Sequence, residues 1–323
     1  MSPRGFNHLT VLRDEAVDGL AIRPDGVYVD CTAGGAGHSC AILDALGPNG
    51  RLIALDRDPS AVLVARARIA ERLARRDDPP AAEVVHAPFS DLSAVLSGLG
   101  LAPHSVHGIL ADLGVSSPQL DVADRGFSFR LDGPLDMRMD TSTGETAADL
   151  VNTLEDRELA DILKRHGDER HARRIARAVV DRRATALFTR TEDLAAVIAG
   201  VIPRKHQKPG IHPATKAFQA LRIAVNAEHT ELATLLDDAR TWLAPAGRLA
   251  VITFHSGEDR AVKQSFAKLA RGRELPPAEA IYRTHGDPLV RLPHPKGITP
   301  SPDEIARNPR SRSARLRIAE ILP

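Results

Sequence analysis

Strand-like and helix-like segments alternate along the first 112 residues, and this alternation limits the fold more than any other feature of the chain. One segment, residues 52–55, is an unbroken apolar run, which is typical of a strand buried on both faces of a sheet. Strands that alternate with helices form βαβ units, so we expect a parallel sheet covered by helices. The strand-like segments are residues 27–29, 52–55, 83–86 and 106–111, and the helix-like segments are residues 39–46 and 59–76.

The pattern changes after residue 140. Three helical periodicities follow one another with no strand between them, at residues 147–166, 170–183 and 191–202. A long helix is expected to begin near Pro213, because proline suits the first turn of a helix, and to end by Gly247. Residues 249–254 are expected to form a fifth buried strand. The sequence thus predicts one α/β domain, residues 1–117 and 213–323, interrupted by an all-helical insertion at residues 118–212.

Cysteine usage and hydropathy exclude several classes of protein. Cys31 and Cys40 are too few for a disulfide framework, and they lack the spacing of metal ligands. The N-terminus has no apolar signal core, and the longest apolar run, near residues 194–202, is too short to span a bilayer. We therefore expect a cytoplasmic protein with no membrane segment and no metal site.

A net charge of +1 conceals a strong local asymmetry. From Lys164 to Lys216 there are 13 Lys or Arg residues against five Asp or Glu residues. Arginines at 307, 310, 312, 315 and 317 form a second basic cluster, which leads into an alternating segment expected to be an edge strand. Concentrated positive charge is typical of a protein that binds a polyanion, although a solvated helix face has the same composition.

Residues 112–140 form a long segment with neither helical nor strand periodicity. Glycine, proline, serine and aspartate are frequent in it, so turns determine its path. A loop of this length in a compact domain is usually functional or disordered. Interleaved apolar residues, Phe127 and Met137 among them, argue against disorder because they can anchor the loop.

A glycine-rich turn joins the first strand to the first helix. Glycines let the backbone approach a ligand, and a helix N-terminus offers free N–H groups. Asp56 ends the second strand, 22 residues after Gly34, where a carboxylate can bind both ribose hydroxyls. This predicts a nucleoside site, although such a turn can also serve only to reverse the chain. The spacing is not the G-x-G-x-x-G of dinucleotide sites, which weakens an NAD-linked interpretation. The turn contains Gly34, Gly35, Ala36, Gly37 and His38.

Three further side chains follow predicted strands at the same sheet edge. Phe89 is placed to lie against an adenine or to pack beneath the sheet, and both alternatives are open. Asp112 ends the fourth strand, where open α/β sheets bind ligands, although an isolated Asp also forms turns. His255 follows the fifth strand, either beside a substrate or as part of a helix start. We favour Ser256 as the N-cap of that helix.

Several motifs, in order along the chain from about His8 to Glu320, closely resemble the MraW/RsmH methyltransferases. That family has a Rossmann-like class I methyltransferase sheet with an inserted helical domain. It transfers a methyl group from S-adenosylmethionine to the exocyclic N4 of a cytidine in the decoding region of 16S ribosomal RNA. The matching motifs are residues 7–12, 32–39, 112–140, 212–215, 218–223, 254–256 and 308–314.

The resemblance assigns expected roles to individual residues. Ala36, Gly37 and His38 match the family's glycine-loop contacts, together with the neighbouring Gly34 and Gly35. Asp56 matches the ribose carboxylate and Phe89 the aromatic residue beside the adenine. Asp112 and Gln119 match contacts that flank the methionine part of the cofactor. Asp112 and His255 are the candidate catalytic residues, although Gly257 replaces a larger apolar residue of the family and weakens the case for His255.

The expected function is therefore methylation of a cytidine in 16S ribosomal RNA, free or within the small ribosomal subunit, with S-adenosylmethionine as the cofactor. The basic insertion would be an RNA-recognition domain. The sequence leaves open a small-molecule methyltransferase or a non-catalytic ribosome-assembly factor on the same fold. It also leaves the oligomeric state open, and a homodimer is one option.

Overall fold

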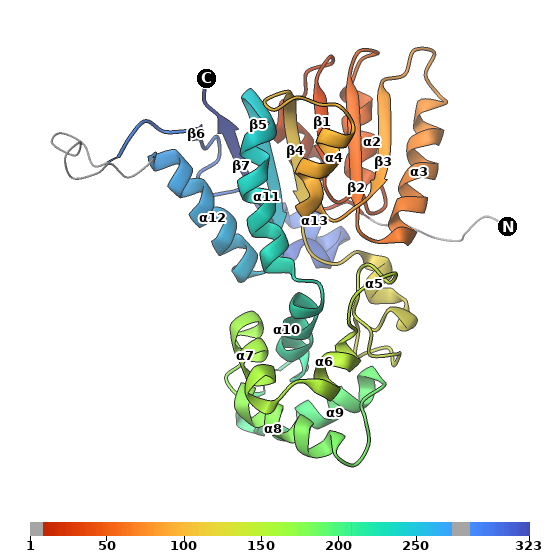
Figure 1. The fold of residues 1–323 in the computed structure, drawn as a ribbon, viewed down its shortest axis with the longest axis vertical. Coiled ribbons are helices and arrows are strands. Elements are labelled where there is room, and N and C mark those ends of the chain that lie inside the picture. The colour runs from red at the N-terminus through yellow and green to blue at the C-terminus, as the bar shows by residue number, and fades with distance from the viewer. Residues whose placement is uncertain (1–8, 208, 273–284) are drawn as a thin grey trace. The chain divides into compact units, whose positions relative to one another are not determined.

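The computed structural model describes residues 9–207, 209–272 and 285–323. The chain divides into two compact units (Figure 1). One contains the residues up to Gly114 together with Thr230–Pro323, and the other is Val115–His229. In the described part of the chain, no helix combines the length and apolarity needed to cross a membrane.

A seven-stranded sheet forms the centre of the first unit, with the strand order β3-β2-β1-β4-β5-β7-β6. The first five strands are parallel, while β7 is antiparallel to both β5 and β6. This topology confirms the predicted Rossmann-like α/β sheet. The strands are β1 (Val27–Asp30), β2 (Arg51–Asp56), β3 (Ala81–His86), β4 (Val106–Asp112), β5 (Leu243–Thr253), β6 (Val290–Arg291) and β7 (Arg315–Ile321).

Helices cover both faces of the sheet because alternate residues of each strand face two different cores. In β2, Ile53 and Leu55 join the core beneath α4, α11 and α12, whereas Leu52 and Ala54 join the core beneath α1, α2 and α3. The first set comprises α4 (Leu92–Gly98), α11 (Glu228–Trp242) and α12 (Ser256–Arg271), and the second α1 (Arg13–Leu20), α2 (Gly37–Ala45) and α3 (Pro59–Leu73). The remaining short elements are η1 (Phe89–Asp91), α13 (Pro302–Arg307) and η4 (Pro309–Ser313).

Two expectations about the end of the chain were wrong. The helix expected to reach Gly247 ends at Trp242, and β5 begins at Leu243, so Gly247 lies within a strand. The alternating arginine segment forms β7, which is not an edge strand because β5 and β6 pair with its two sides.

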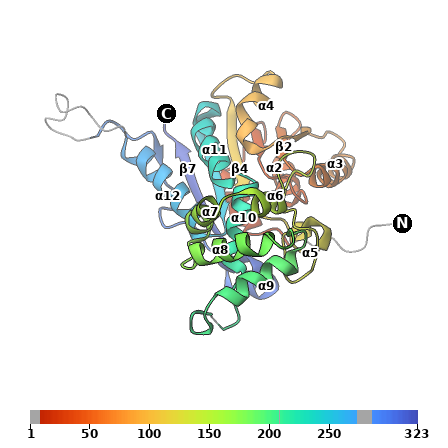
Figure 2. The same cartoon turned by 60° about the horizontal axis from the view of Figure 1, so that its bottom comes forward.

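The second unit is built from helices, which gather into one bundle (Figure 2). Among its described residues no strand occurs, only the isolated bridge between Pro134 and Arg190. Phe127, Met137 and Met139 are buried in its core, so the long loop is anchored as expected. Its elements are α5 (Ser117–Asp121), η2 (Ala123–Arg125), α6 (Ala147–Thr153), α7 (Asp156–Gly167), α8 (Ala172–Arg183), α9 (Thr191–Val201), η3 (Arg204–His206) and α10 (Thr215–Val225).

Two predicted helices are each divided in two. Thr146 and Glu155 open separate capping boxes, so the segment 147–166 forms α6 and α7. The helix expected from Pro213 breaks near Asn226, whose buried side chain accepts a hydrogen bond from the Met139 N–H and donates one to the Met137 carbonyl. The helical unit thus runs from Val115 to His229 and includes α10, beyond the limit of 212 expected for the insertion.

Candidate functional site

Three carboxylates lie at the carboxyl ends of three neighbouring strands in the first unit. Asp56, Asp30 and Asp112 are the last residues of β2, β1 and β4, which are adjacent in the sheet. Strand order reverses between β1 and β4, because successive strands are added on opposite sides of β1. Open α/β sheets bind ligands at such a reversal. The sheet therefore gathers acceptor groups at the position where a ligand is expected.

The glycine-rich turn between β1 and α2 is fixed by hydrogen bonds on several sides. Gly34 and Ala36 have left-handed backbones, with φ of +49° and +59°. The Gly34 N–H donates to Asp56 Oδ2 at 2.7 Å, and the Gly35 carbonyl accepts from Arg68 Nη1 at 2.6 Å. A side chain at Gly37 would collide with Thr10, since its Cβ would lie 1.8 Å from Oγ1. The turn is thus preformed rather than loose.

Space beside this turn suits a ligand. A Cβ built at Gly34 would meet only the Thr32 carbonyl oxygen, at 3.8 Å, so protein atoms do not fill the adjacent volume. The positive φ nevertheless favours glycine there. An approaching ligand would therefore contact backbone rather than side chain at this position.

Asp56 is held by the backbone on both of its oxygens. Oδ1 accepts from the Asp58 N–H at 2.8 Å, and Oδ2 accepts from Gly34. Burial raises the pKa of Asp56 to about 6, although the two backbone hydrogen bonds oppose that rise. The ionised carboxylate is thus destabilised before any ligand binds, and donor groups from a ligand would stabilise it.

Asp112 has a buried oxygen without a partner. Oδ1 is fully covered and accepts no hydrogen bond from the described residues, while Oδ2 lies 3.8 Å from His38 Nδ1. Burial raises the pKa of Asp112 well above its usual range, and the charges of Asp30 and Glu258 raise it further. Because an unsatisfied buried acceptor is uncommon in native proteins, this oxygen is a candidate ligand contact.

The ring of His38 is oriented by the chain entering α1. Its side chain is 4% exposed, and Nε2 lies 3.2 Å from the Val11 carbonyl oxygen. Since a carbonyl only accepts hydrogen bonds, Nε2 carries a proton. Nδ1 is thereby directed to the same side as the Asp112 carboxylate. Phe89, by contrast, lies half-buried in η1 and packs against the core beneath α4 and α11.

The N-cap of α12 is His255 and not Ser256, which corrects the prediction from the sequence. His255 Nδ1 accepts from the N–H groups of Gly257 at 3.1 Å and Glu258 at 3.4 Å. Nε2 therefore carries the proton, and it lies 3.1 Å from the buried Glu258 Oε1. Nδ1 is thus engaged in starting the helix, so the geometry supports a structural role.

Substitution of His255 distinguishes capping from catalysis. His255→Ala is expected to lower the free energy of unfolding by about 1 kcal/mol, because an N-cap is lost. His255→Asn restores a capping side chain and is expected to keep both the stability and most of the methyl-transfer rate that the sequence resemblance implies. Thermal denaturation and kcat measured on the two variants provide the check. A stable Asn variant with a strongly reduced kcat would instead support the predicted catalytic role.

Gln119 belongs to the second unit, whereas the other predicted site residues belong to the first. It is buried in α5, and its Oε1 accepts from the Ser116 N–H at 2.9 Å, which closes the first turn of that helix. Its observed contact is thus a local capping box.

Sequence reasoning missed four residues that shape the site. Asp30 accepts from Ser39 Oγ at 2.6 Å, and Thr32 Oγ1 accepts from the Asp112 N–H at 2.7 Å. Glu258 accepts from the Phe254 N–H at 2.8 Å, and Arg68 fixes the glycine turn. Asp30 could have been found, because it ends β1 as Asp56 ends β2. Arg68 carries no such signal within an arginine-rich helix.

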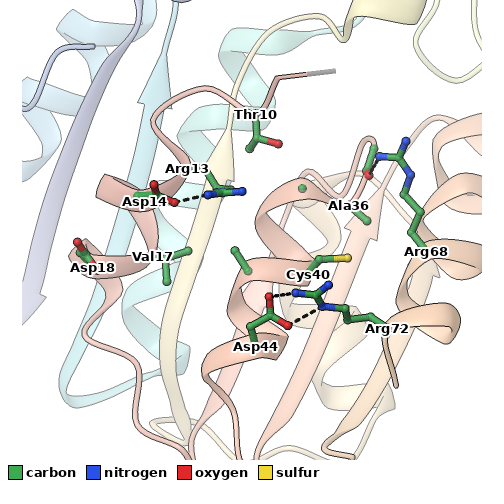
Figure 3. A pocket seen from close by; sticks show the side chains of 13 residues that line it. Thr10, Arg13, Asp14, Val17, Asp18, Ala36, Cys40, Asp44, Arg68 and Arg72 are labelled. Atoms are coloured by element: carbon green, nitrogen blue, oxygen red, sulfur yellow. Dashed lines mark hydrogen bonds and ion pairs between the residues drawn. The ribbon is translucent and has the colours of Figure 1, made fainter. Parts of the chain in front are cut away.

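A groove of about 650 Å³ lies on the outer side of the glycine turn, among α1, α2 and α3 (Figure 3). Its guanidinium groups already have partners within the protein. Arg13 pairs with Asp14, and Arg72 pairs with Asp44. Arg68 extends from α3 to the Gly35 carbonyl. Two of its three guanidinium groups are therefore neutralised by carboxylates of the groove, and the third supports the turn.

Arg68 is thus a positioning residue for the glycine turn. Arg68→Ala is expected to weaken binding of S-adenosylhomocysteine, the demethylated form of the cofactor that the sequence resemblance implies, about 10- to 100-fold, the effect of losing one charged hydrogen bond, without lowering kcat at saturating cofactor. Calorimetric titration measures the affinity. Arg66→Ala is the matched control, because Arg66 lies on the same helix but donates to the Val84 carbonyl. Equal affinities of the two variants would contradict this role.

The C-terminal arginines contribute less free charge than their number suggests. Arg317 is 6% exposed and forms two hydrogen bonds with the Asp259 carboxylate. Arg315 donates to the Lys296 carbonyl and also lies 3.9 Å from Asp259. These two members of the second basic cluster hold β7 against α12 and the neighbouring loop.

Comparisons with known proteins agree on one family. The model of the MraW methylase family matches residues 5–322. A relative from Alteromonas mediterranea, named ribosomal RNA small subunit methyltransferase H, is 47% identical over 321 residues, which cover 99% of both chains.

Solved structures give only distant likenesses. An rRNA methylase from Streptococcus thermophilus is 11% identical with a TM-score of 0.39, and 96% of this chain and 94% of that chain are covered. An S-adenosylmethionine-dependent O-methyltransferase from Thermotoga maritima is 9% identical with a TM-score of 0.40, and coverage is 98% and 68%. The family model and the close relative carry the assignment: this chain belongs to the MraW methylase family and is a methyltransferase that uses S-adenosylmethionine, as predicted.

Proposed function

We propose that this protein transfers a methyl group to the exocyclic N4 of a cytidine in the decoding region of small-subunit ribosomal RNA. The observation that carries the choice of RNA is the 47% identical relative, whose name specifies ribosomal RNA of the small subunit. The observation that supports chemistry at an amine is the unpartnered, buried Oδ1 of Asp112.

The residues at the sheet edge fit the proposed cofactor. Asp56 would accept hydrogen bonds from both ribose hydroxyls, and Phe89 would lie beside the adenine. The backbone of Gly34, Gly35, Ala36 and Gly37, with His38, would contact the cofactor as the family's glycine loop does, and Asp112 and Gln119 would flank its methionine part. When bound, S-adenosylmethionine supplies an electrophilic methyl group on a positively charged sulfur. The acidic residues at the ends of β1 and β4 suit such a cation.

Asp112 would activate the acceptor amine. The lone pair of a cytosine amine is delocalised into the ring, so the amine is a weak nucleophile. A carboxylate that accepts an amino hydrogen localises the lone pair and then takes the proton released when the N–C bond forms. A cation beside Asp112 would favour its ionised form and so offset the effect of burial. Backbone carbonyls in residues 113–117 are alternative acceptors, and His255 is a weaker candidate because Nδ1 serves as a cap.

The helical insertion, residues 118–212 in the domain division we propose, would recognise the RNA. A cytidine must leave its stacked position before a protein can enclose its amine, and this requires contacts to the neighbouring nucleotides. The excess of basic residues in this part of the chain suits such contacts.

Methyl incorporation from labelled cofactor into small-subunit particles, naked ribosomal RNA and free cytidine tests the proposal. We expect label in one or both RNA substrates as N4-methylcytidine, and none in free cytidine. Label in free cytidine alone would support a small-molecule methyltransferase. No label in any RNA, with Asp56→Ala behaving like the wild type, would support a non-catalytic assembly factor and contradict the proposal.

A further inference from the structure

Five exposed cations without an acidic partner are concentrated in two stretches of the second unit. Among the described residues, no carboxylate lies within ion-pair distance of any of them. Two short segments supply them, one at the start of α8 and the other in η3. We call these five residues the basic patch: Arg170, Arg173, Arg174, Arg204 and Lys205.

A histidine pair joins the two segments of the basic patch. His206 Nδ1 lies 3.0 Å from His171 Nε2, and the two rings stack with centroids 5.0 Å apart and an interplanar angle of 21°. His171 is the N-cap residue of α8, and His206 ends η3. The contact therefore brings cations that are about 30 residues apart in the sequence to one place on the surface.

Several other arginines of this unit are neutralised locally, whereas Arg130, Arg157 and Arg165 are exposed and have no carboxylate within ion-pair distance among the described residues. Arg177 lies 3.2 Å from Asp181, Arg182 lies 2.8 Å from Asp193, and Arg190 lies 2.6 Å from Asp132. The excess positive charge predicted from the sequence is thus not spread evenly over a solvated helix face. Five of its unpaired cations lie in the basic patch.

The position of the basic patch is unfavourable for the isolated fold. The first turn of α8 contains Arg173 and Arg174 and no acidic residue. The positive end of the helix dipole favours acidic side chains in a first turn, so two arginines there repel it and each other. A bound polyanion would remove this repulsion. The unpaired positive charge of the basic patch, the proximity of its two segments and its position at the start of α8 therefore all favour an anionic partner.

We propose that the basic patch binds the phosphate backbone of the RNA strand that carries the target cytidine. This inference rests on the proposed function and specifies which surface of the second unit holds the substrate. Arginine forks match phosphate oxygens in two-point hydrogen bonds, and exposed cations bind phosphates by charge without distinguishing bases. The basic patch would thus supply affinity, while selection of the cytidine occurs at the carboxyl edge of the sheet.

Salt dependence of RNA binding tests this proposal. Each phosphate neutralised on a single strand contributes about −0.7 to the slope of log K against log salt concentration. The triple variant Arg173→Gln/Arg174→Gln/Arg204→Gln is therefore expected to flatten the slope by about 2 and to weaken binding about 10²-fold at 0.1 M salt. The probes are a labelled single-stranded fragment of the decoding region and a fragment of scrambled sequence. Both should lose affinity equally, because the contacts are to the backbone.

The matched control removes the same charge elsewhere in the unit. Arg177→Gln/Arg182→Gln/Arg190→Gln replaces three arginines that have acidic partners, and it is expected to keep the slope of the wild type within about 0.5, less than the effect of one phosphate contact. Binding of S-adenosylhomocysteine by the patch variant should match that by the control variant, and the thermal midpoint of the patch variant should be no lower than that of the control. Equal slopes for the two triple variants, or a loss of affinity for the decoding-region fragment alone, would overturn the proposal.

Wild-type methylation is measured separately on small-subunit particles. Its absence would contradict the proposed function, whereas the difference between the two triple variants judges the basic patch alone. With a methylating wild type, the patch variant is expected to raise the KM for RNA at least 10-fold and to leave kcat unchanged at saturating RNA. An unchanged KM would count against the proposal.

Discussion

Asp112→Asn is expected to lower kcat for methyl transfer by about 10²- to 10⁴-fold, the usual contribution of a positioned proton acceptor. Asn keeps the size of the side chain but cannot take a proton from the substrate amine. Its remaining carbonyl oxygen can still accept one hydrogen bond, so binding of S-adenosylhomocysteine should change less than 10-fold, about 1.4 kcal/mol. Single-turnover methylation of RNA and calorimetric titration of the cofactor product measure these two quantities.

The same substitution is expected to stabilise the fold. Because burial raises the pKa of Asp112 in the folded protein, the folded state binds a proton more tightly than the unfolded state does. The free energy of unfolding therefore falls as the pH rises from the unfolded pKa through the folded pKa. Asn lacks this titration, so the variant should have the higher thermal midpoint at pH 7, with the advantage vanishing below pH 4. A loss of kcat accompanied by a lower midpoint would indicate a structural role instead.

Asp56→Ala is expected to weaken cofactor binding by about 10²- to 10⁴-fold, because two hydrogen bonds to a charged group are lost. S-adenosylhomocysteine is the appropriate ligand, since it has the ribose hydroxyls but no sulfonium charge. In the wild type, its affinity should decline as the pH falls below about 6, where Asp56 becomes protonated in the free protein. The dissociation constant should then rise up to tenfold for each unit of pH, and the Ala variant should show no such dependence.

Two controls separate the ribose contact from the shape of the glycine turn. Asp56→Asn keeps an acceptor for the Gly34 N–H, loses the one for the Asp58 N–H and has no titrating carboxyl, so it should remove the pH dependence and preserve most of the turn. Arg68→Ala should loosen the turn and retain the pH dependence, because Asp56 is intact. A wild-type affinity that is constant between pH 5 and 7 would rule out Asp56 as the ribose carboxylate.

The sheet and its carboxylates were predictable because strand burial leaves a clear pattern in the sequence. An apolar run followed by an acidic residue identified the ends of β2 and β4, where Asp56 and Asp112 lie. The parallel connection then placed these ends at one edge. For this part of the fold, the apolar side chains that identify a strand in the sequence are the same ones that pack in the core.

Other features depend on contacts between distant residues, which no local pattern reports. Arg68 reaches Gly35 from a separate helix. The break after α10 occurs at Ala227, whose φ of +50° is not signalled by a glycine or proline. Charge counting treated Arg317 as free, although Asp259 neutralises it. His255 and Ser256 were both able to cap α12, and only the backbone geometry distinguishes them.

The pairing of β4 with β5 also determines the order in which the protein can fold during synthesis. The helical unit is continuous in sequence, so all of its residues are synthesised before β5. The sheet cannot be completed until β5 has been synthesised. Until then the edge of β4 that later pairs with β5, at Ile109 and Ala111, has no neighbouring strand, although β1 can pair with the opposite edge. Pairing between strands that are distant in sequence is slow, and meanwhile the unpaired strand edge can form hydrogen bonds with another chain. The nascent chain therefore leaves this edge unpaired for more than 130 residues of translation, from the end of β4 to β5.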